Sequence, residues 1–330
     1  MNHSLEDIFS AISSKRVLVV GDLMLDRYIW GDASRLSPEA PVPVVRVDRE
    51  TAVAGGAANV AINLAALGAG SVELFGWIGK DEAGACLQGL LAEGGVHLLE
   101  GAADAAHQTI TKTRVVCRRQ QVCRLDCEKE PAAYALTEEA LRSYIAPAAA
   151  RVDAILLSDY AKGILTPQSI RAIQSLPNRP AVLTLDPKPR SGIDYSGLML
   201  LTPNRSEALR LAGIEDIPGM AFPAEAVCRA IHEAWAPKHL VVTMGPDGML
   251  LAENGTPLER IPTFAREVFD VSGAGDTVIA ALTLAMAAGI PLPDAARFAN
   301  TAAGVVVGKL GTATASPDEI RAYAKTLLKG

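Results

Sequence analysis

The chain is poor in aromatic residues and in paired cysteines, and each shortage narrows the classes of protein to which it could belong. Aromatic side chains make up 5% of the 330 residues, a composition that suits helices packed closely on a sheet. The five cysteines are an odd number, and none forms a C-x-x-C pair. The sequence therefore indicates neither a disulfide framework nor a zinc site, and reduced thiols in the cytosol are the simplest interpretation.

No stretch of the sequence has the pattern of a membrane-spanning helix. The longest apolar run, residues 278–293, contains Gly289, Pro291 and Pro293. It falls short of the about 18 to 20 apolar residues that a membrane span requires, so we predict a buried helix. The amino-terminal residues MNHSLEDIFSAISSKR contain no apolar core of a signal peptide. We expect a cytoplasmic protein without a membrane partner.

The charge balance and the first strand exclude two further classes. A net charge of −6 argues against a nucleic-acid surface as the main function. The first strand, RVLVVGD, runs on without a G-x-G-x-x-G turn, which argues against a dinucleotide-dependent oxidoreductase. With 49% hydrophobic and 21% charged residues, the composition is that of an ordinary globular protein.

Strand and helix patterns alternate along most of the chain. Apolar runs predict strands at residues 16–22, 71–79, 154–158, 181–186, 199–202, 239–244 and 248–252. Helical spacing predicts helices at residues 55–69, 81–95, 138–149, 167–176, 204–213, 223–235, 274–288 and 294–308. This alternation predicts an α/β fold with a mostly parallel sheet covered on both faces.

Two segments, about residues 23–51 and 108–128, depart from this alternation. The second, QTITKTRVVCRRQQVCRLDCE, alternates polar and apolar residues with period two, as in an antiparallel hairpin with one exposed face. We predict that both segments form a small sheet standing off a single domain of residues 1–330.

The stretch DVSGAGD, from Asp270 to Asp276, places two carboxylates on either side of a turn of small residues. The backbone N–H groups of Gly273, Ala274 and Gly275 can face one concavity, and the following helix adds its positive end. The alternative is an ordinary helix cap made by an aspartate. The two glycines favour an anion site, because a capped surface helix does not require them.

Two further motifs carry polar groups suited to a polyol. In GGAAN, two glycines open a helix and Asn59 can both donate and accept hydrogen bonds. In GDLMLD, Asp22 and Asp26 follow a strand end, where ligands of open α/β sheets bind. A tight turn and solvated loop carboxylates are the respective alternatives.

A second group of motifs would suit a nucleotide. Asn204 and Glu207 share one face of a helix start, which fits hydrated Mg²⁺ and phosphate oxygens, although a capping box explains the same spacing. Lys188 follows a strand end, where it is either simply exposed or faces a phosphate. The turn TMGPDGM adds the candidates Thr243, Gly245 and Gly248.

Together these motifs resemble those of the ribokinase-like (PfkB) carbohydrate kinases over essentially the whole length of the chain. The resemblance implies a three-layer α/β/α fold with a mostly parallel central sheet, a small β-sheet lid, and the use of ATP and Mg²⁺. The stretches SPEAPVPVVRV, TKTRV, QQVCRLD, TPNRSE and ANTAAGVVVGKLGTAT resemble one branch of this family. That branch phosphorylates D-glycero-β-D-manno-heptose 7-phosphate at C1 in the ADP-heptose pathway for lipopolysaccharide.

Many members of that branch carry a fused adenylyltransferase domain. This chain stops at Gly330, so it resembles the stand-alone kinase.

The resemblance also assigns roles to individual residues. It makes Asp276 the base that takes the proton of the acceptor hydroxyl, with the N–H groups of Gly273, Ala274 and Gly275 stabilising the transferred phosphoryl group. Asp270 then positions the loop. The implied sugar-binding residues are Asp22, Asp26, Gly55, Gly56 and Asn59. The implied ATP-binding residues are Lys188, Asn204, Glu207, Thr243, Gly245, Gly248 and Asn300, with Glu207 also holding the metal through water.

A phosphorylated substrate needs basic partners at its far end. Period two places Lys112, Arg114 and Arg118 on one face of the hairpin and Arg119 on the other, and we expect Lys112 and Arg114 to bind the substrate phosphate. A basic lid edge that merely prevents strand pairing is the alternative. The exposed lid edges also predict a homodimer formed through the lid.

Two other functions remain open at this point. A kinase of the same family could act on ribose, fructose or a hexose phosphate. A catalytically silent sugar-binding regulator could share the fold, because fold alone does not determine function.

Overall fold

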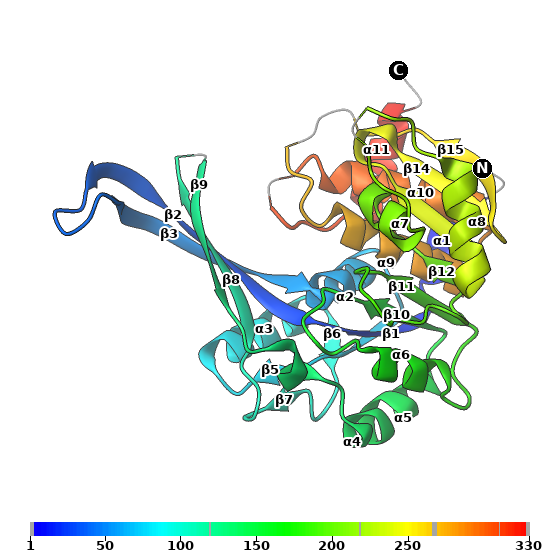
Figure 1. Cartoon of the computed structure of the whole chain (residues 1–330), viewed down its shortest axis with the longest axis horizontal. Coiled ribbons are helices and arrows are strands. Elements are labelled where there is room, and N and C mark those ends of the chain that lie inside the picture. The colour runs from blue at the N-terminus through cyan, green and yellow to red at the C-terminus, as the bar shows by residue number, and fades with distance from the viewer. Residues whose placement is uncertain (1–2, 119, 218, 266–268, 310, 328–330) are drawn as a thin grey trace.

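The computed structural model describes residues 3–118, 120–217, 219–265, 269–309 and 311–327. In this part of the chain a nine-stranded sheet forms the centre of the molecule (Figure 1). Its strands lie in the order β15 (Thr256–Ile261), β14 (Met249–Glu253), β13 (His239–Thr243), β12 (Leu200–Leu201), β11 (Val182–Asp186), β10 (Ala154–Ser158), β1 (Arg16–Gly21), β4 (Ser71–Phe75) and β6 (Val96–Leu98). All neighbours from β13 to β6 pair in parallel, and only β14 and β15 add antiparallel pairs.

Apolar residues on both faces of this sheet explain why helices cover both. In β1, Val17 and Val19 belong to one hydrophobic core, whereas Leu18 and Val20 belong to the other. Because successive side chains of a strand point to opposite faces, one short apolar run supplies both cores. The predicted three-layer α/β/α fold is confirmed.

The helices divide between the two cores. One core contains residues of α1 (Leu5–Ile12), α2 (Ala57–Ala66), α3 (Glu82–Glu93), α9 (Ala274–Ala287), α10 (Leu292–Val306) and α11 (Pro317–Leu327). The other contains residues of α4 (Glu138–Ala140), α5 (Ala146–Ala149), α6 (Pro167–Gln174), α7 (Arg205–Leu211) and α8 (Ala224–Trp235). Among the described residues, no helix combines the length and the apolar character needed to cross a bilayer.

The helix predicted over residues 138–149 is interrupted. Between α4 and α5 lies a π-helical turn, Leu141–Ile145, and Pro147 is the second residue of α5. Proline has no N–H to donate to the preceding turn, so the regular hydrogen-bond pattern cannot continue through it.

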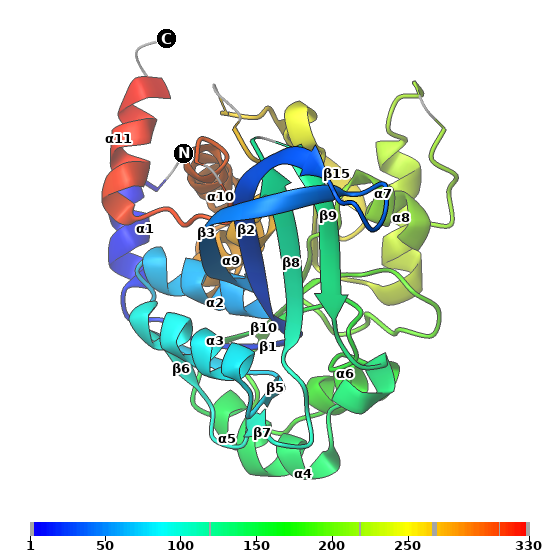
Figure 2. The same ribbon diagram turned by 90° about the vertical axis from the view of Figure 1, so that its left-hand side faces the viewer.

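The two irregular segments form a second sheet, which we call the lid. Figure 1 shows it standing away from the central sheet, and Figure 2 shows it facing the viewer. Its described strands lie in the order β3 (Pro43–Gly56), β2 (Leu23–Leu36), β8 (Ile110–Cys117) and β9 (Gln120–Cys127). The pairs β2–β3 and β8–β9 are antiparallel, whereas β2 and β8 run parallel.

The strands β2 and β3 are each 14 residues long. Irregularities in their register, between Trp30 and Gly31 and between Asp32 and Arg35, let one long pair continue where the polar–apolar pattern breaks. A two-stranded sheet, β5 (Ile78–Gly79) with β7 (Ala103–Asp104), completes the described sheets near the root of the lid.

Candidate active site

Asp276 lies in the first turn of α9, and its carboxylate is buried between two donors. The amide Nδ2 of Asn59 donates to Oδ2 at 2.6 Å, and the hydroxyl of Tyr160 donates to Oδ1 at 2.5 Å. Asn59 is itself oriented by Asn63 Nδ2, which donates to its Oδ1 at 3.2 Å. The carboxylate is therefore held by two groups that favour its charged form.

Burial has the largest effect on the pKa of this carboxylate. It raises the pKa of Asp276 to about 6, against the lowering effect of the hydrogen bonds from Tyr160 and Asn59. A carboxylate with this pKa is mostly deprotonated at neutral pH and is still basic enough to accept a proton, as general-base catalysis requires.

The turn before α9 leaves the start of the helix without a side-chain cap. Gly273 is the N-cap residue, with φ of +79°, and no side chain hydrogen-bonds to the first N–H groups. A Cβ at Gly273 would lie 3.0 Å from Asn59 Nδ2, whereas a Cβ at Gly275 would meet no atom within 4 Å. The backbone of the turn is thus accessible to a ligand, and the alternative in which an aspartate caps the helix does not apply.

Asp270, the other aspartate of the motif, holds the turn in place. Its Oδ1 accepts from Ser272 N at 2.9 Å and its Oδ2 accepts from Gly311 N at 3.1 Å. Although burial acts in the opposite direction, these hydrogen bonds keep the pKa of Asp270 below its ordinary value. Its contacts are those of a residue that positions the loop.

Asp22 anchors the loop that follows β10. Its carboxylate accepts three backbone hydrogen bonds, from Tyr160 N at 2.9 Å, Lys162 N at 3.0 Å and Ile164 N at 3.1 Å. Burial nevertheless raises the pKa of Asp22. Asp22 therefore has a structural role, and its predicted contact with sugar hydroxyls stays a prediction.

The two glycines of GGAAN lie at the end of β3, directly before α2. A Cβ at Gly55 would lie 2.3 Å from Asp26 Oδ2, and one at Gly56 would lie 2.4 Å from the carbonyl oxygen of Asp22. Gly56 also has φ of +58°, a conformation that favours glycine. Close packing against β2 thus requires both glycines, whether or not a ligand contacts them.

Charged side chains line one face of the lid. Strand register places Asp26, Lys112 and Asp126 in one row across β2, β8 and β9, and Tyr28, Arg114 and Arg124 in the next row on the same face. Residues of this face lie near the start of α9. The charge of Asp26 raises the pKa of Asp276, and the charge of Arg114 lowers the pKa of Asp270.

Most of the cations near this face already hold a carboxylate. Arg114 pairs with Asp26 at 2.5 Å, Arg124 with Asp126 at 2.8 Å, and Lys162 with Glu128 at 2.6 Å. Lys112 differs, because within the described residues it makes no ion pair. Burial lowers the pKa of Lys112, and the nearby charge of Lys162 adds to this effect.

Arg118, which the sequence predicted on the same face as Lys112 and Arg114, does not join this group. Arg118 lies beyond the end of β8, has a positive φ of 58° and pairs with Asp32. The strand alternation that was predicted to align it with Lys112 ends before it. Arg119 lies outside the described residues.

Asn204 and Glu207 form a capping box at the start of α7. Asn204 Oδ1 accepts from Glu207 N at 3.0 Å, and Glu207 Oε2 accepts from Asn204 N at 3.0 Å. The other carboxylate oxygen of Glu207 accepts from Lys188 Nζ at 3.0 Å. The capping alternative is therefore present, and it brings Lys188 to Glu207.

Of the other predicted nucleotide-binding residues, Thr243 ends β13, Gly245 and Gly248 lie between β13 and β14, and Asn300 lies in α10. Thr243 pairs with Asn204 in an isolated parallel bridge, which joins the two motifs. A Cβ at Gly248 would lie 2.0 Å from the carbonyl oxygen of Ile261, so packing requires this glycine, while the space around Gly245 is open. Asn300 is buried and donates to the carbonyl oxygen of Pro262 at 2.7 Å.

Two residues near Asp276 were missed in the sequence. Tyr160 follows β10 and Asp186 ends β11, so both lie at the carboxyl ends of parallel strands, a position that could have singled them out. Burial, then the nearby carboxylates of Asp276 and Glu207, raise the pKa of Asp186 well above its ordinary value. Within the described chain, no three His, Cys, Asp or Glu side chains are arranged to ligate a metal directly.

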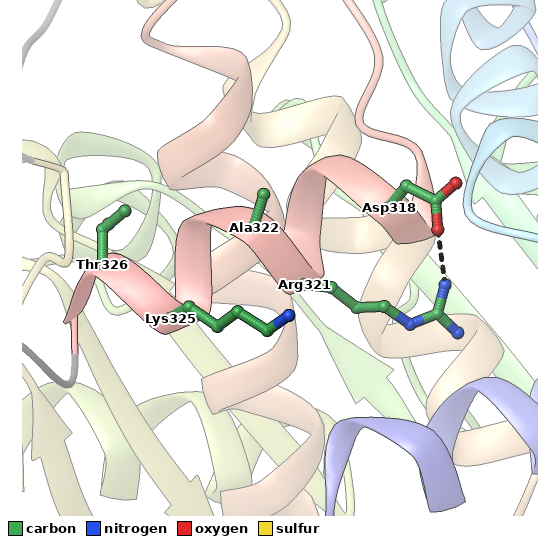
Figure 3. A pocket seen from close by; sticks show the side chains of 5 residues that line it. All are labelled: Asp318, Arg321, Ala322, Lys325 and Thr326. Carbon is green, nitrogen blue, oxygen red and sulfur yellow. Dashed lines mark hydrogen bonds and ion pairs between the residues drawn. The ribbon is translucent and has the colours of Figure 1, made fainter.

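A hollow on α11 lies apart from this site. Figure 3 shows its five lining side chains, Asp318, Arg321, Ala322, Lys325 and Thr326, all on that one helix. None of them is among the predicted site residues, and Arg321 is already engaged by Asp318 and Glu6.

Solved structures of sugar kinases superimpose on this chain. The ribokinase of Thermotoga maritima superimposes with a TM-score of 0.74 at 22% sequence identity, covering 94% of this chain and 99% of that one. The Arabidopsis thaliana ribokinase complexed with ribose and ATP gives a TM-score of 0.73 at 22% identity, with the same coverage. At this level of identity, the likeness establishes the ribokinase-like fold.

The family follows from the sequence comparison. The family described as "pfkB family carbohydrate kinase" matches residues 14–319. The chain belongs to the pfkB family of carbohydrate kinases.

Its curated relatives are longer proteins. It is 45% identical over 320 residues to the bifunctional protein HldE of Pelobacter propionicus, covering 96% of this chain and 64% of that protein. It is 44% identical over 329 residues to the bifunctional protein HldE of Caulobacter vibrioides, covering 99% of this chain and 67% of that protein. The chain thus spans about two thirds of the length of these relatives.

Proposed function

We propose that this protein is a cytoplasmic kinase that transfers the γ-phosphoryl group of ATP to C1 of D-glycero-β-D-manno-heptose 7-phosphate. The product is the heptose 1,7-bisphosphate of ADP-heptose and lipopolysaccharide inner-core biosynthesis. Membership in the pfkB family and the sequence resemblance to its heptose-phosphate branch support this proposal. The observation that carries it is the buried carboxylate of Asp276 beside an uncapped glycine turn, below a lid face with an unpaired lysine.

Asp276 is the proposed general base. The substrate hydroxyl donates its hydrogen bond to this carboxylate, which accepts the proton as the oxygen attacks phosphorus. The N–H groups at the start of α9 then lie where the charge of the transferred phosphoryl group develops, and the helix end favours negative charge there. Phosphoryl transfer depends mainly on such positioning and charge stabilisation.

The acidic residues below the nucleotide motifs suit a hydrated cation. The charges of Asp276 and Glu207 both disfavour ionisation of Asp186, and a divalent cation bound with the phosphates would relieve this repulsion. We assign Glu207 to Mg²⁺ through water. Lys188 pairs with Glu207, and we assign it to the phosphates of the nucleotide.

The proposed base gives a prediction for the pH dependence. Asp276 must be deprotonated to accept a proton, and burial sets its pKa at about 6. We expect kcat to fall about tenfold for each pH unit below that value, because the deprotonated fraction falls by the same factor. A kcat that stays constant down to pH 4.5, with the protein still folded, would contradict this.

Lys112 is our first choice for binding the 7-phosphate, with Arg114 beside it. Replacing a residue that makes a charged hydrogen bond costs about 1.5–3 kcal/mol. We therefore expect Lys112→Ala to raise the KM for the sugar phosphate about 10- to 100-fold and to leave the KM for ATP nearly unchanged. Steady-state kinetics with each substrate varied in turn make this measurement.

Arg46→Ala is the matched control for Lys112→Ala. Arg46 is also a lid cation, but it is exposed and pairs only with Asp48. Its replacement should leave both KM values within about twofold, as expected of an exposed ion pair. Equal effects of the two substitutions would show that Lys112 has no special part in phosphate binding.

A homodimer formed through the lid is part of the proposal. The lid has two edge strands, β3 and β9, and exposed apolar side chains at Leu36, Val47, Val122 and Leu125. Unpaired edges and exposed apolar groups favour association with a second lid.

A panel of acceptors tests the substrate. ADP release is measured with heptose 7-phosphate, ribose, fructose and hexose phosphates at equal concentrations. We expect heptose 7-phosphate to give the highest kcat/KM. Release with ribose but not with heptose 7-phosphate would replace the specific proposal with another sugar kinase, and ligand binding without any ADP release would favour a silent sugar-binding regulator.

A further inference from the structure

We propose that Tyr160 is a positioning residue that fixes the orientation of the Asp276 carboxylate from a rigid loop anchored by Asp22. The inference rests on the proposed role of Asp276 as general base. It concerns a residue that none of the sequence motifs includes.

The contact between Tyr160 and Asp276 joins two distant parts of the chain. The Tyr160 hydroxyl donates to Asp276 Oδ1 at 2.5 Å, opposite the amide of Asn59 on Oδ2 at 2.6 Å. An ionised carboxylate offers about four acceptor positions. Two donors therefore fix its plane and still leave positions open for the hydroxyl of a substrate.

The loop that carries Tyr160 has little freedom to move. Asp22 accepts the N–H groups of Tyr160, Lys162 and Ile164. Ala161 has φ of +57°, which is uncommon for a residue with a side chain. Such a backbone conformation persists only where the surrounding contacts hold it in place, and residues of this kind are common near catalytic groups.

Two ion pairs extend the anchoring of this loop. Asp159 Oδ1 accepts from Ala161 N and from Arg190 Nη1, each at 2.8 Å. Lys162 pairs with Glu128, which directly follows the lid strand β9. The loop thus connects the proposed base Asp276, through Tyr160, with the end of lid strand β9, through Lys162.

Tyr160 is suited to remain a donor. Burial, followed by the negative charges of Asp276, Asp186 and Asp26, raises the pKa of Tyr160 well above its ordinary value, so the hydroxyl keeps its proton. The carboxylate of Asp26, on β2, disfavours ionisation of Asp276, and the charge of Asp276 in turn disfavours ionisation of Asp186 at the end of β11. The donors Tyr160 and Asn59 favour the ionised form of Asp276.

The test is the pH profile of Tyr160→Phe. This substitution keeps the ring and removes only the donor, so the carboxylate loses one hydrogen bond to its charged form. We expect kcat at pH 7 to fall about 10- to 100-fold and the acidic limb of kcat to move about one pH unit higher. Both KM values should stay within about threefold, since Tyr160 is not proposed to contact substrate.

Tyr134→Phe is the matched control. Tyr134 is also buried, and its hydroxyl makes two hydrogen bonds at 3.0 Å, to Gln108 O and from Lys129 N. It does not contact Asp276, so its replacement should leave the acidic limb in place. An equal shift in Tyr134→Phe would mean that any lost buried hydroxyl has this effect, which would overturn the inference.

A second substitution at residue 160 should shift the acidic limb of the pH profile in the opposite direction. Incorporation of 3-fluorotyrosine at residue 160 makes the hydroxyl a stronger donor, and the acidic limb should then move to lower pH. This measurement stands even if Tyr160→Phe does not fold.

The inference and the proposed function fail in different ways. If Asp276→Asn is inactive while Tyr160→Phe changes neither kcat nor the acidic limb, the base assignment stands and the positioning role is wrong. If Asp276→Asn keeps most activity, the base assignment is wrong and the inference falls with it.

Discussion

Replacing Asp276 with asparagine should lower kcat by about 10²- to 10⁴-fold, the usual contribution of a general base, while changing the KM for ATP and for sugar by only a few-fold. The amide keeps the size and shape of the carboxylate, so binding of both substrates is retained. It cannot accept the proton of the attacking hydroxyl, so the transition state loses its base. Initial rates of ADP formation over a range of both substrates make this measurement.

Asp270→Asn is the natural control, because both aspartates belong to the same seven-residue motif. Asp270 accepts backbone hydrogen bonds from Ser272 N in its own turn and from Gly311 N after α10, and its amide retains one acceptor. We expect a fall in kcat of about tenfold or less, the cost of one weakened hydrogen bond. If Asp276→Asn kept most activity and Asp270→Asn lost it, the roles of the two aspartates would have to be exchanged.

Replacing Asp22 with alanine should lower the free energy of unfolding by about 3 kcal/mol or more, because each of its three N–H partners would lose its buried acceptor. The loop at Tyr160 would also lose its anchor, so kcat should fall as well. Urea denaturation monitored by circular dichroism measures the first effect, and the kinetic assay measures the second.

Asp153→Ala provides the comparison for Asp22→Ala. Asp153 also accepts a backbone hydrogen bond, from Arg16 N at 2.8 Å, but its side chain is 32% exposed. Water can replace this acceptor, so we expect a loss of about 1 kcal/mol or less and unchanged kcat. A denaturation midpoint of Asp22→Ala as close to the wild type as that of Asp153→Ala would show that Asp22 does not anchor the loop.

The layered fold was predictable because each of its elements leaves a local pattern. Apolar runs located β1, β10, β11 and β13, and helical spacing located α9 and α10, since these patterns repeat within a few residues. The length of β2 and β3 was not predictable, because register shifts conceal the continuity of that pair.

The site was predictable where small residues and carboxylates share one short motif. DVSGAGD indicated both the accessible turn and Asp276, and the structure confirms that the turn is uncapped. The sequence could not show which contacts the side chains make. Tyr160 and Asp276 are 116 residues apart, and a single tyrosine after a strand has no pattern that announces its partner.

The ion pairs of the lid bear on which anions the protein attracts. Arg114, Arg124 and Lys162 already hold the carboxylates of Asp26, Asp126 and Glu128, so the described part of the lid does not present a continuous cationic surface to polyanions. A ligand with a single negative charge gains little by competing with these carboxylates. On the proposed function, we expect a doubly charged phosphate monoester to interact more strongly with Lys112 and with its neighbours. We therefore expect the internal pairing to act as a charge threshold that favours phosphate esters over sugar acids of the same size.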